Sequence, residues 1–160
     1  MSEEPNNSTI LFGIGNVGRQ DDALGWIFLE YIQNENLKGL DIEYRYQLQI
    51  EDAELISKYN NVIFIDACKE NIDNGFFVKP CKARENHNFS THALDPETVI
   101  YLTQKLYHHK PKAFIIGIQG YRWDLEMGVS KQAYTNYLKA INYFIENQND
   151  IANLDKKTNL

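Results

Sequence analysis

The stretch 9–32, TILFGIGNVGRQDDALGWIFLEYI, holds an apolar run, a glycine-rich loop and an amphipathic segment, in that order. The run at 9–14 is rich in Ile and apolar on both faces, as buried parallel strands are. After the loop, Leu24, Ile27 and Phe28 begin a series of apolar residues at helical spacing. A strand that passes through a short loop into a helix predicts the first part of a parallel α/β sheet.

Four further segments have the patterns of strands. Continuous apolar runs at 61–66 and 112–118 predict buried strands. The segment 40–48 alternates apolar and polar residues, which favours a strand near the edge of the sheet. Residues 75–79 predict a short fifth strand.

Helical patterns separate these strands. Asp95 is placed to cap a helix that has Pro96 at its first position, and Ser130 is placed to cap a last helix that runs to 147. A shorter helix is expected at about 51–58. The order of strands and helices predicts an α/β fold, a three-layer α/β/α sandwich with a mostly parallel five-stranded sheet.

Length and composition limit the organisation of the chain. We expect one domain at 9–147, with flexible polar termini at 1–8 and 148–160. A net charge of -6 argues against a general nucleic-acid binder, which needs clustered Lys and Arg. No apolar run approaches the roughly 18 residues of a membrane helix, and the acidic N-terminus is unlike a signal peptide.

The two cysteines, Cys68 and Cys81, lack the spacing of a metal site. Reduced thiols in a cytoplasmic protein are the simplest interpretation, and a single disulfide is the alternative. Because the chain is acidic and has no apolar run of membrane length, we expect neither nucleic acid nor a membrane among the partners.

The loop between Gly13 and Gly18 spells G-x-G-x-x-G between a strand and a helix, which is the setting of a dinucleotide-binding loop. Two features argue against that function. Asp21 and Asp22 lie where a pyrophosphate would bind, and the next strand ends in YQL at 46–48, without an acid for the ribose. A dinucleotide-binding enzyme remains one alternative.

Three polar side chains are expected at the rim where the parallel strands end. The acid pair supplies one helix cap at most, which leaves Asp22 free to face the crevice. Asp66 follows four apolar residues, where it either forms a turn or serves as a site carboxylate. His92 lies in the loop before the helix that Asp95 caps. Two carboxylates and an imidazole are a plausible incomplete ligand set for nickel or zinc.

Taken together, the motifs resemble those of the hydrogenase maturation proteases, the endopeptidases that trim the C-terminus of the large subunit of nickel–iron hydrogenases. The resemblance covers about residues 9–147. Its motifs, in chain order, are GIGNVGRQDDALG at 13–25, Ile65-Asp66-Ala67, Ser90-Thr91-His92, Gly117-Ile118-Gln119 and Gly128-Val129-Ser130. The chain departs from the family at Ala23, where glycine is usual, and at 46–48, where some members have Asp or His.

The resemblance implies that Asp22, Asp66 and His92 are the metal-binding and catalytic residues. It implies that the metal is nickel, which is supplied by the substrate, a hydrogenase large-subunit precursor, rather than resident in the protease. From the residues themselves, Gly15 and Asn16 are candidates to steady the substrate carbonyl oxygen, and no Ser or Cys stands in a nucleophile motif.

The function so implied is endopeptidase removal of a C-terminal extension from the nickel-loaded precursor. The alternative from another class is a non-catalytic nickel-sensing chaperone on the same fold, which would bind the precursor and leave its length unchanged.

Overall fold

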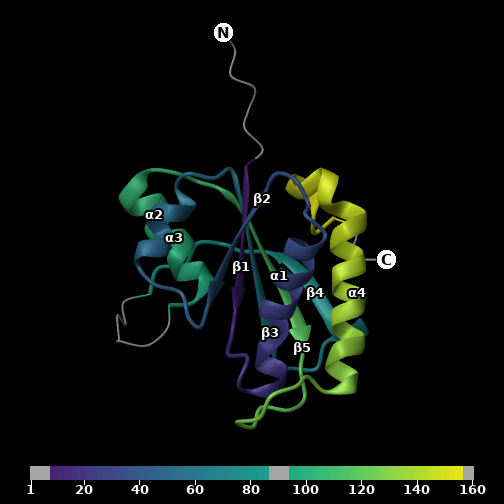
Figure 1. Cartoon of the computed structure of the whole chain (residues 1–160). Coiled ribbons are helices and arrows are strands. Elements are labelled where there is room, and N and C mark those ends of the chain that lie inside the picture. The colour runs from purple at the N-terminus through teal and green to yellow at the C-terminus, as the bar shows by residue number, and fades with distance from the viewer. Residues whose placement is uncertain (1–7, 87–93, 157–160) are drawn as a thin grey trace.

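The computed structural model describes residues 8–86 and 94–156 and contains a five-stranded sheet between two layers of helices (Figure 1). The strands lie in the order β2-β1-β3-β5-β4. Of the described strands, only β4 runs antiparallel to its neighbour, β5. The strands are β1 Thr9–Ile14, β2 Leu40–Arg45, β3 Asn61–Cys68, β4 Phe76–Pro80 and β5 Lys112–Gln119. The predicted mostly parallel sheet is confirmed.

Helices α1 and α4 cover one face of the sheet, and α2 and α3 cover the other (Figure 1). The α-helices are α1 Leu24–Asn34, α2 Glu51–Ile56, α3 Pro96–Tyr107 and α4 Lys131–Asn147, and the 3-10 helices are η1 Gln20–Ala23, η2 Asp73–Gly75 and η3 Gln148–Asn153. The predicted caps are present: Asp95 accepts a hydrogen bond from the backbone N–H of Thr98 at 2.8 Å, and Ser130 from that of Ala133 at 3.3 Å.

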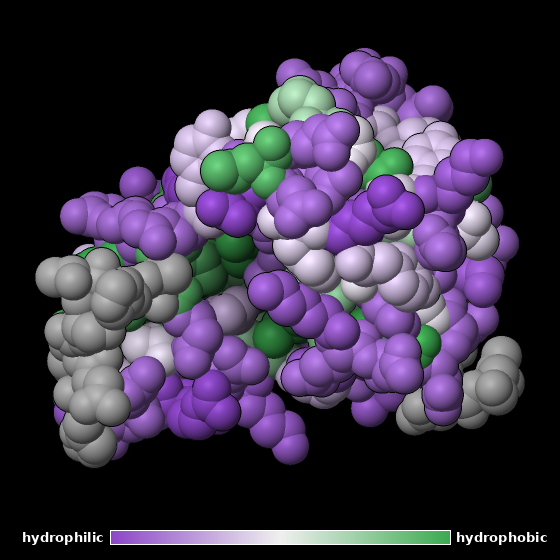
Figure 2. Space-filling view, turned by 90° about the horizontal axis from the view of Figure 1, so that it is seen from below, coloured by the Kyte–Doolittle hydropathy of each residue, from purple (hydrophilic) through white to green (hydrophobic). Residues whose placement is uncertain are grey.

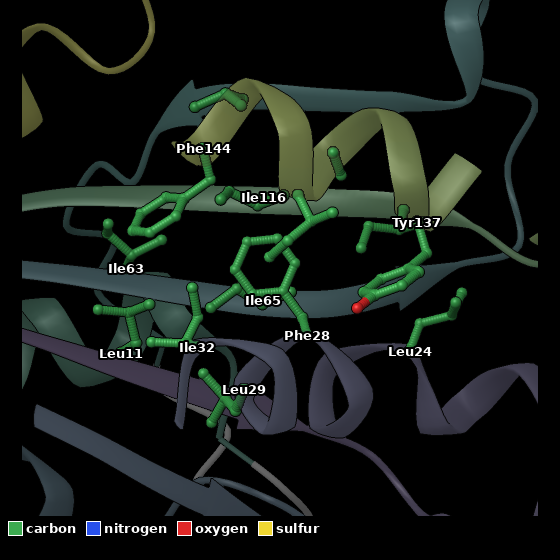
Figure 3. Close-up of a cluster of buried hydrophobic side chains, with 14 of the residues drawn as sticks. Leu11, Leu24, Phe28, Leu29, Ile32, Ile63, Ile65, Ile116, Tyr137 and Phe144 are labelled. Atoms are coloured by element: carbon green, nitrogen blue, oxygen red, sulfur yellow. The ribbon is translucent and has the colours of Figure 1, made fainter. Parts of the chain in front are cut away.

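The central strands are apolar on both faces because each face meets a helical layer. On one side, Ile63 and Ile65 of β3 pack with α1 and α4, where the rings of Phe28 and Phe144 meet edge to face at 5.6 Å (Figure 3). On the other side, Phe64 belongs to the cluster that includes residues of α2 and α3. Burying each such side chain is worth about 1.5–3 kcal/mol. This packing fixes β1 and β3 between the layers.

The start of α1 lies directly on the backbones of β1 and β3. A Cβ on Gly25 would lie 2.5 Å from the carbonyl oxygen of Ile65 and 2.8 Å from the amide nitrogen of Ile14. A Cβ on Gly13 would lie 2.5 Å from the carbonyl oxygen of Gly25. Only glycine permits these approaches, so the loop serves close helix–sheet packing. The same contact fixes η1, and with it Asp22, at the end of β1.

Asp21 is fully buried in η1, and its carboxylate accepts four hydrogen bonds. The donors are the backbone N–H groups of Tyr121 at 2.7 Å, Arg122 at 2.9 Å and Ser130 at 2.7 Å, and the Ser130 hydroxyl at 2.8 Å. Burial acts to raise the pKa of Asp21, but the hydrogen bonds outweigh it, and the pKa lies below its ordinary value. Helix capping by this acid pair is not observed. Asp21 instead connects η1, through these hydrogen bonds, to the segment between β5 and α4.

Two strands, β2 and β3, end two or more residues away from their predicted ends. β2 stops at Arg45, beyond which the chain leaves the sheet: Tyr46 is exposed, and Leu48 is buried in a bridge with Leu94. β3 continues to Cys68, because its pairing with β5 continues. Asp66 therefore lies inside β3, opposite the last residue of β1, and not at the strand end.

The predicted end of the folded domain at 147 is too early. The chain continues as η3, and Ile151 and Leu154 are buried in the cluster formed with α1 and α4. Two apolar residues in a polar segment suffice to attach it to the core. At the other predicted flexible end, Ser8 accepts hydrogen bonds from the backbone N–H groups of Asn60 and Asn61, and residues 1–7 and 157–160 lie outside the described part. Within 8–86 and 94–156, no helix is long and apolar enough to cross a membrane.

The substitution Asp21→Asn is expected to destabilise the fold by about 2–4 kcal/mol, because an amide cannot accept all four hydrogen bonds and turns its own N–H groups toward donors. The measurement is the free energy of unfolding in urea. The matched control is Asp124→Asn. Asp124 is exposed and lies in the segment between β5 and α4 that Asp21 contacts, and its substitution should change stability by less than about 0.5 kcal/mol. Equal stability of Asp21→Asn and wild type would contradict this role of Asp21.

Candidate functional site

Asp22 and Asp66 line one cavity at the end of the sheet where the parallel strands terminate. Its volume is about 340 Å³, and its described lining comprises Ile14, Gly15, Asp22, Tyr46, Gln47, Leu48, Asp66, Leu94, Asp95 and Pro96. Figure 2 looks onto this end of the molecule and shows a hollow among the surface side chains. The register that pairs Ile14 with Asp66 places the side-chain carboxyl of Asp66 beside the end of β1. The structure thus brings together two of the three predicted site residues.

The carboxyl of Asp22 is held by the glycine loop. One of its oxygens accepts a hydrogen bond from the backbone N–H of Asn16 at 2.9 Å. Gly15 has a φ of 142°, and a Cβ there would lie 1.9 Å from the carbonyl oxygen of Asp22. Burial raises the pKa of Asp22, although the Asn16 hydrogen bond and the charges of Arg19 and Lys69 act in the opposite direction. Asp22 is therefore fixed in position and only partly hydrated.

Asp66 has the more strongly altered acidity. Burial, and then the charge of Asp22, raises the pKa of Asp66 to about 7, while a hydrogen bond from the backbone of Ala67 opposes the shift. Near neutral pH, the pair therefore holds one carboxylate and one carboxyl that gains and loses its proton readily. Such a pair can donate and accept protons, and in its ionised form it can bind a divalent cation.

The third predicted ligand, His92, lies outside the described residues. Among the residues that the structure describes, no group of three or more His, Cys, Asp and Glu side chains is placed to hold a metal ion. The metal triad thus stays a prediction.

Three backbone amides of the glycine loop are already engaged within the fold. Gly15 N–H donates to the carbonyl oxygen of Arg45 at 2.9 Å, Asn16 N–H to Asp22, and Gly18 N–H to the side-chain oxygen of Asn16 at 2.8 Å. These bonds argue against the expectation that the backbone N–H groups of Gly15 and Asn16 steady a substrate carbonyl oxygen, whereas the same role for the Asn16 side chain stays a prediction. The same bonds also argue against a pyrophosphate cradle, which needs free N–H groups.

Neither cysteine is an activated nucleophile. Burial, and then the charges of Asp66 and Glu70, raises the pKa of the Cys68 thiol to about 11, and burial raises that of Cys81 to about 12. Both cysteines are free, which confirms the expected thiols. Since the thiolate is the reactive form, a cysteine mechanism is disfavoured at neutral pH.

The sequence did not indicate the wall of the cavity that follows β2. Tyr46 lines the cavity and stacks on Trp26 with ring centroids 5.2 Å apart, and Trp26 donates to the carbonyl oxygen of Arg45 at 2.9 Å. Arg45 also pairs with buried Asp52 at 3.0 Å, and Asp52 accepts from the backbone N–H of Gln49 at 2.9 Å. These contacts hold 46–49 against the site. The available sequence signal was the alternation of apolar and polar residues at 40–48. It predicted a strand that continues past Arg45, and not a cavity wall.

The fold is similar to those of several solved hydrogenase maturation proteases. Hydrogenase maturating endopeptidase HybD from Escherichia coli superimposes with a TM-score of 0.66 at 14% identity, over 89% of this chain and 93% of that chain. [NiFe] hydrogenase maturation protease HycI from Thermococcus kodakarensis gives 0.67 at 19% identity, over 94% of each chain. Hydrogenase 2 maturation peptidase from a Thaumarchaeota archaeon gives 0.65 at 14% identity, over 88% and 97%.

No family model and no curated protein sequence matches the chain. The structural comparisons confirm the fold that the resemblance implies, and these proteases share that fold over nearly their whole length.

The substitution Asp66→Asn is expected to flatten the pH dependence of stability. An acid whose pKa is raised to about 7 from 3.8 binds more protons folded than unfolded, so stability falls as pH rises from about 4 through 7. At pH 8, Asp66→Asn should be more stable than wild type by on the order of 2 kcal/mol, and by much less at pH 4. Urea unfolding at several pH values measures this, with exposed Glu54→Gln as control. Parallel curves for Asp66→Asn and wild type would disprove it.

Proposed function

We propose that this protein is an endopeptidase that removes a C-terminal extension from the nickel-loaded large-subunit precursor of a [NiFe] hydrogenase. The observation that carries the proposal is the pair Asp22 and Asp66, which share one cavity at the end of a sheet whose fold matches hydrogenase maturation proteases. The motif order in the sequence supports the same family independently. Neither the match in fold nor the order of the motifs depends on any single short motif.

Nickel enters this reaction as part of the substrate. Two carboxylates and one imidazole, from Asp22, Asp66 and His92, make an acceptable partial ligand set for a divalent transition metal and leave positions for ligands from the precursor. Binding the metal of the precursor would hold the scissile bond at the cavity and restrict cleavage to precursors that have received their metal.

The carboxyl pair also suits peptide hydrolysis. The attacking water must lose a proton, and the leaving nitrogen must gain one. Asp22 is held by the Asn16 N–H, and the pKa of Asp66 is raised by burial to about 7, so the pair can exchange a proton near neutral pH. Two routes to the water remain open in this proposal, polarisation by the nickel or deprotonation by a carboxylate. Both routes require the carboxyl pair.

We place the reaction in the cytoplasm, with the precursor as the partner and with neither nucleic acid nor a membrane involved. The two free thiols support this location.

Asp22→Asn, Asp66→Asn and His92→Ala are each expected to lower the rate of processing of purified nickel-loaded precursor by at least about 100-fold, because each removes a ligand or proton-transfer group. Gel mobility of the precursor measures the cleavage, and Glu54→Gln on α2 is the control. Undiminished cleavage by all three variants would refute the site. Binding of the precursor by wild type with no change in its length would favour the chaperone alternative.

Removal of nickel should act on the precursor and not on the enzyme. Precursor that is stripped by a chelator and desalted should resist cleavage, and restoring nickel should restore it. Enzyme given the same treatment should cleave nickel-loaded precursor at its normal rate. Loss of activity after treatment of the enzyme alone would indicate a resident metal and contradict the proposal.

A further inference from the structure

The loop 120–128, between β5 and α4, has polar contacts on its inner side and two strongly exposed apolar side chains on its outer side. Beneath it lie Asp21, fully buried, and Gln20, 7% exposed. At its surface, Leu125 is 76% exposed and Met127 is 73% exposed. A surface loop usually shows the reverse arrangement, since exposed apolar area is unfavourable in water.

Hydrogen bonds to η1 hold this loop, and the strongly exposed side chains of Leu125 and Met127 contribute little to holding it. The backbone N–H of Gln20 donates to the carbonyl oxygen of Glu126 at 2.9 Å, and the side-chain oxygen of Gln20 accepts from the N–H of Asp124 at 3.0 Å. The Asp21 carboxylate holds the start of the loop, as described above. Leu125 and Met127 are therefore presented on a backbone that is already fixed, which lowers the entropic cost of binding a partner.

A second pair of exposed apolar side chains follows β2. Tyr46 is 64% exposed and is held by its stack on Trp26, and Ile50 is 53% exposed. We call Tyr46, Ile50, Leu125 and Met127 the apolar rim. Among the described residues, these are the four most exposed of the large hydrophobic side chains. All four come from loops that follow parallel strands, so they gather at one end of the molecule.

The strand order places the carboxyl pair between the two halves of the apolar rim. Tyr46 and Ile50 follow β2, Leu125 and Met127 follow β5, and β1 and β3 lie between these strands. Figure 2, which looks onto this end, shows green hydrophobic side chains standing out among hydrophilic ones. A protein that inserts a segment between the carboxyls would meet apolar side chains on both sides.

We infer that the apolar rim docks the folded body of the precursor, while the extended C-terminal segment of the precursor occupies the cavity. The inference rests on the proposed function and adds to it a second binding surface. Tyr and Met are among the residue types that are enriched in protein–protein interfaces. A second copy of this chain is the less suitable occupant, because it would cover the cavity that the substrate must enter.

The test is the double substitution Leu125→Ser with Met127→Ser, compared with Leu106→Ser. Leu106 is 52% exposed and lies near the C-terminal end of α3, outside the apolar rim. The double variant should raise the KM for nickel-loaded precursor at least about tenfold and change kcat less, because it loses apolar contact area on the bound partner. Leu106→Ser should match wild type in both constants. Urea unfolding of each variant checks that the fold is retained.

Three results would overturn the docking surface: an unchanged KM, a fall in kcat alone, or a concentration-dependent wild-type dimer that the double variant lacks. Sedimentation of the enzyme with intact precursor separates this inference from the proposed function. If wild type does not cleave but forms a complex that the double variant loses, the peptidase proposal fails and the docking surface stands. If wild type forms no complex with the precursor, the docking surface falls.

Discussion

The contact between Gly25 and the backbones of β1 and β3 is the constraint on which the rest of the site depends. With a Cβ position only 2.5 Å from the carbonyl oxygen of Ile65, no side chain fits at Gly25, and α1 starts in van der Waals contact with two strands. The preceding turn, η1, then has no freedom to move away from the sheet. Its two adjacent acids are consequently directed into different parts of the molecule, Asp21 under the loop 120–128 and Asp22 toward Asp66.

These adjacent acids show how environment alone gives two neighbouring carboxyl groups different acidities. Asp21 and Asp22 are chemically identical and neighbours in sequence, and burial acts to raise the pKa of each. Four hydrogen bonds overcome burial at Asp21, so its charge is stable and inert. At Asp22, hydrogen bonding and nearby charges do not outweigh burial, and the charge of Asp22 in turn raises the pKa of Asp66 in the same cavity. A stable anion thus anchors the scaffold, and beside it lies the carboxyl pair to which we assign the chemistry.

The same anchor links the scaffold to the surface that we assign to the partner. Because Asp21 and Gln20 hold the loop 120–128 from beneath, Leu125 and Met127 need not pack against the molecule to order the loop. Loops at the ends of parallel strands carry function in many α/β proteins, since the sheet positions them and does not determine their sequence. Here the sheet order places the apolar rim on both sides of the carboxyl pair.

Local sequence patterns were enough to predict the layers, the parallel strands, the caps at Asp95 and Ser130, and the meeting of Asp22 with Asp66. These features follow from local periodicity, from capping chemistry and from the rule that parallel strands end on one side of a sheet. Three other features became visible only in the folded molecule: Asp21 binds a loop about 100 residues away, β2 stops at Arg45, and Ile151 and Leu154 join the core. Local patterns record which face of a segment is apolar, whereas a buried charge or a bend is decided by donors and neighbours that the fold brings from elsewhere in the chain.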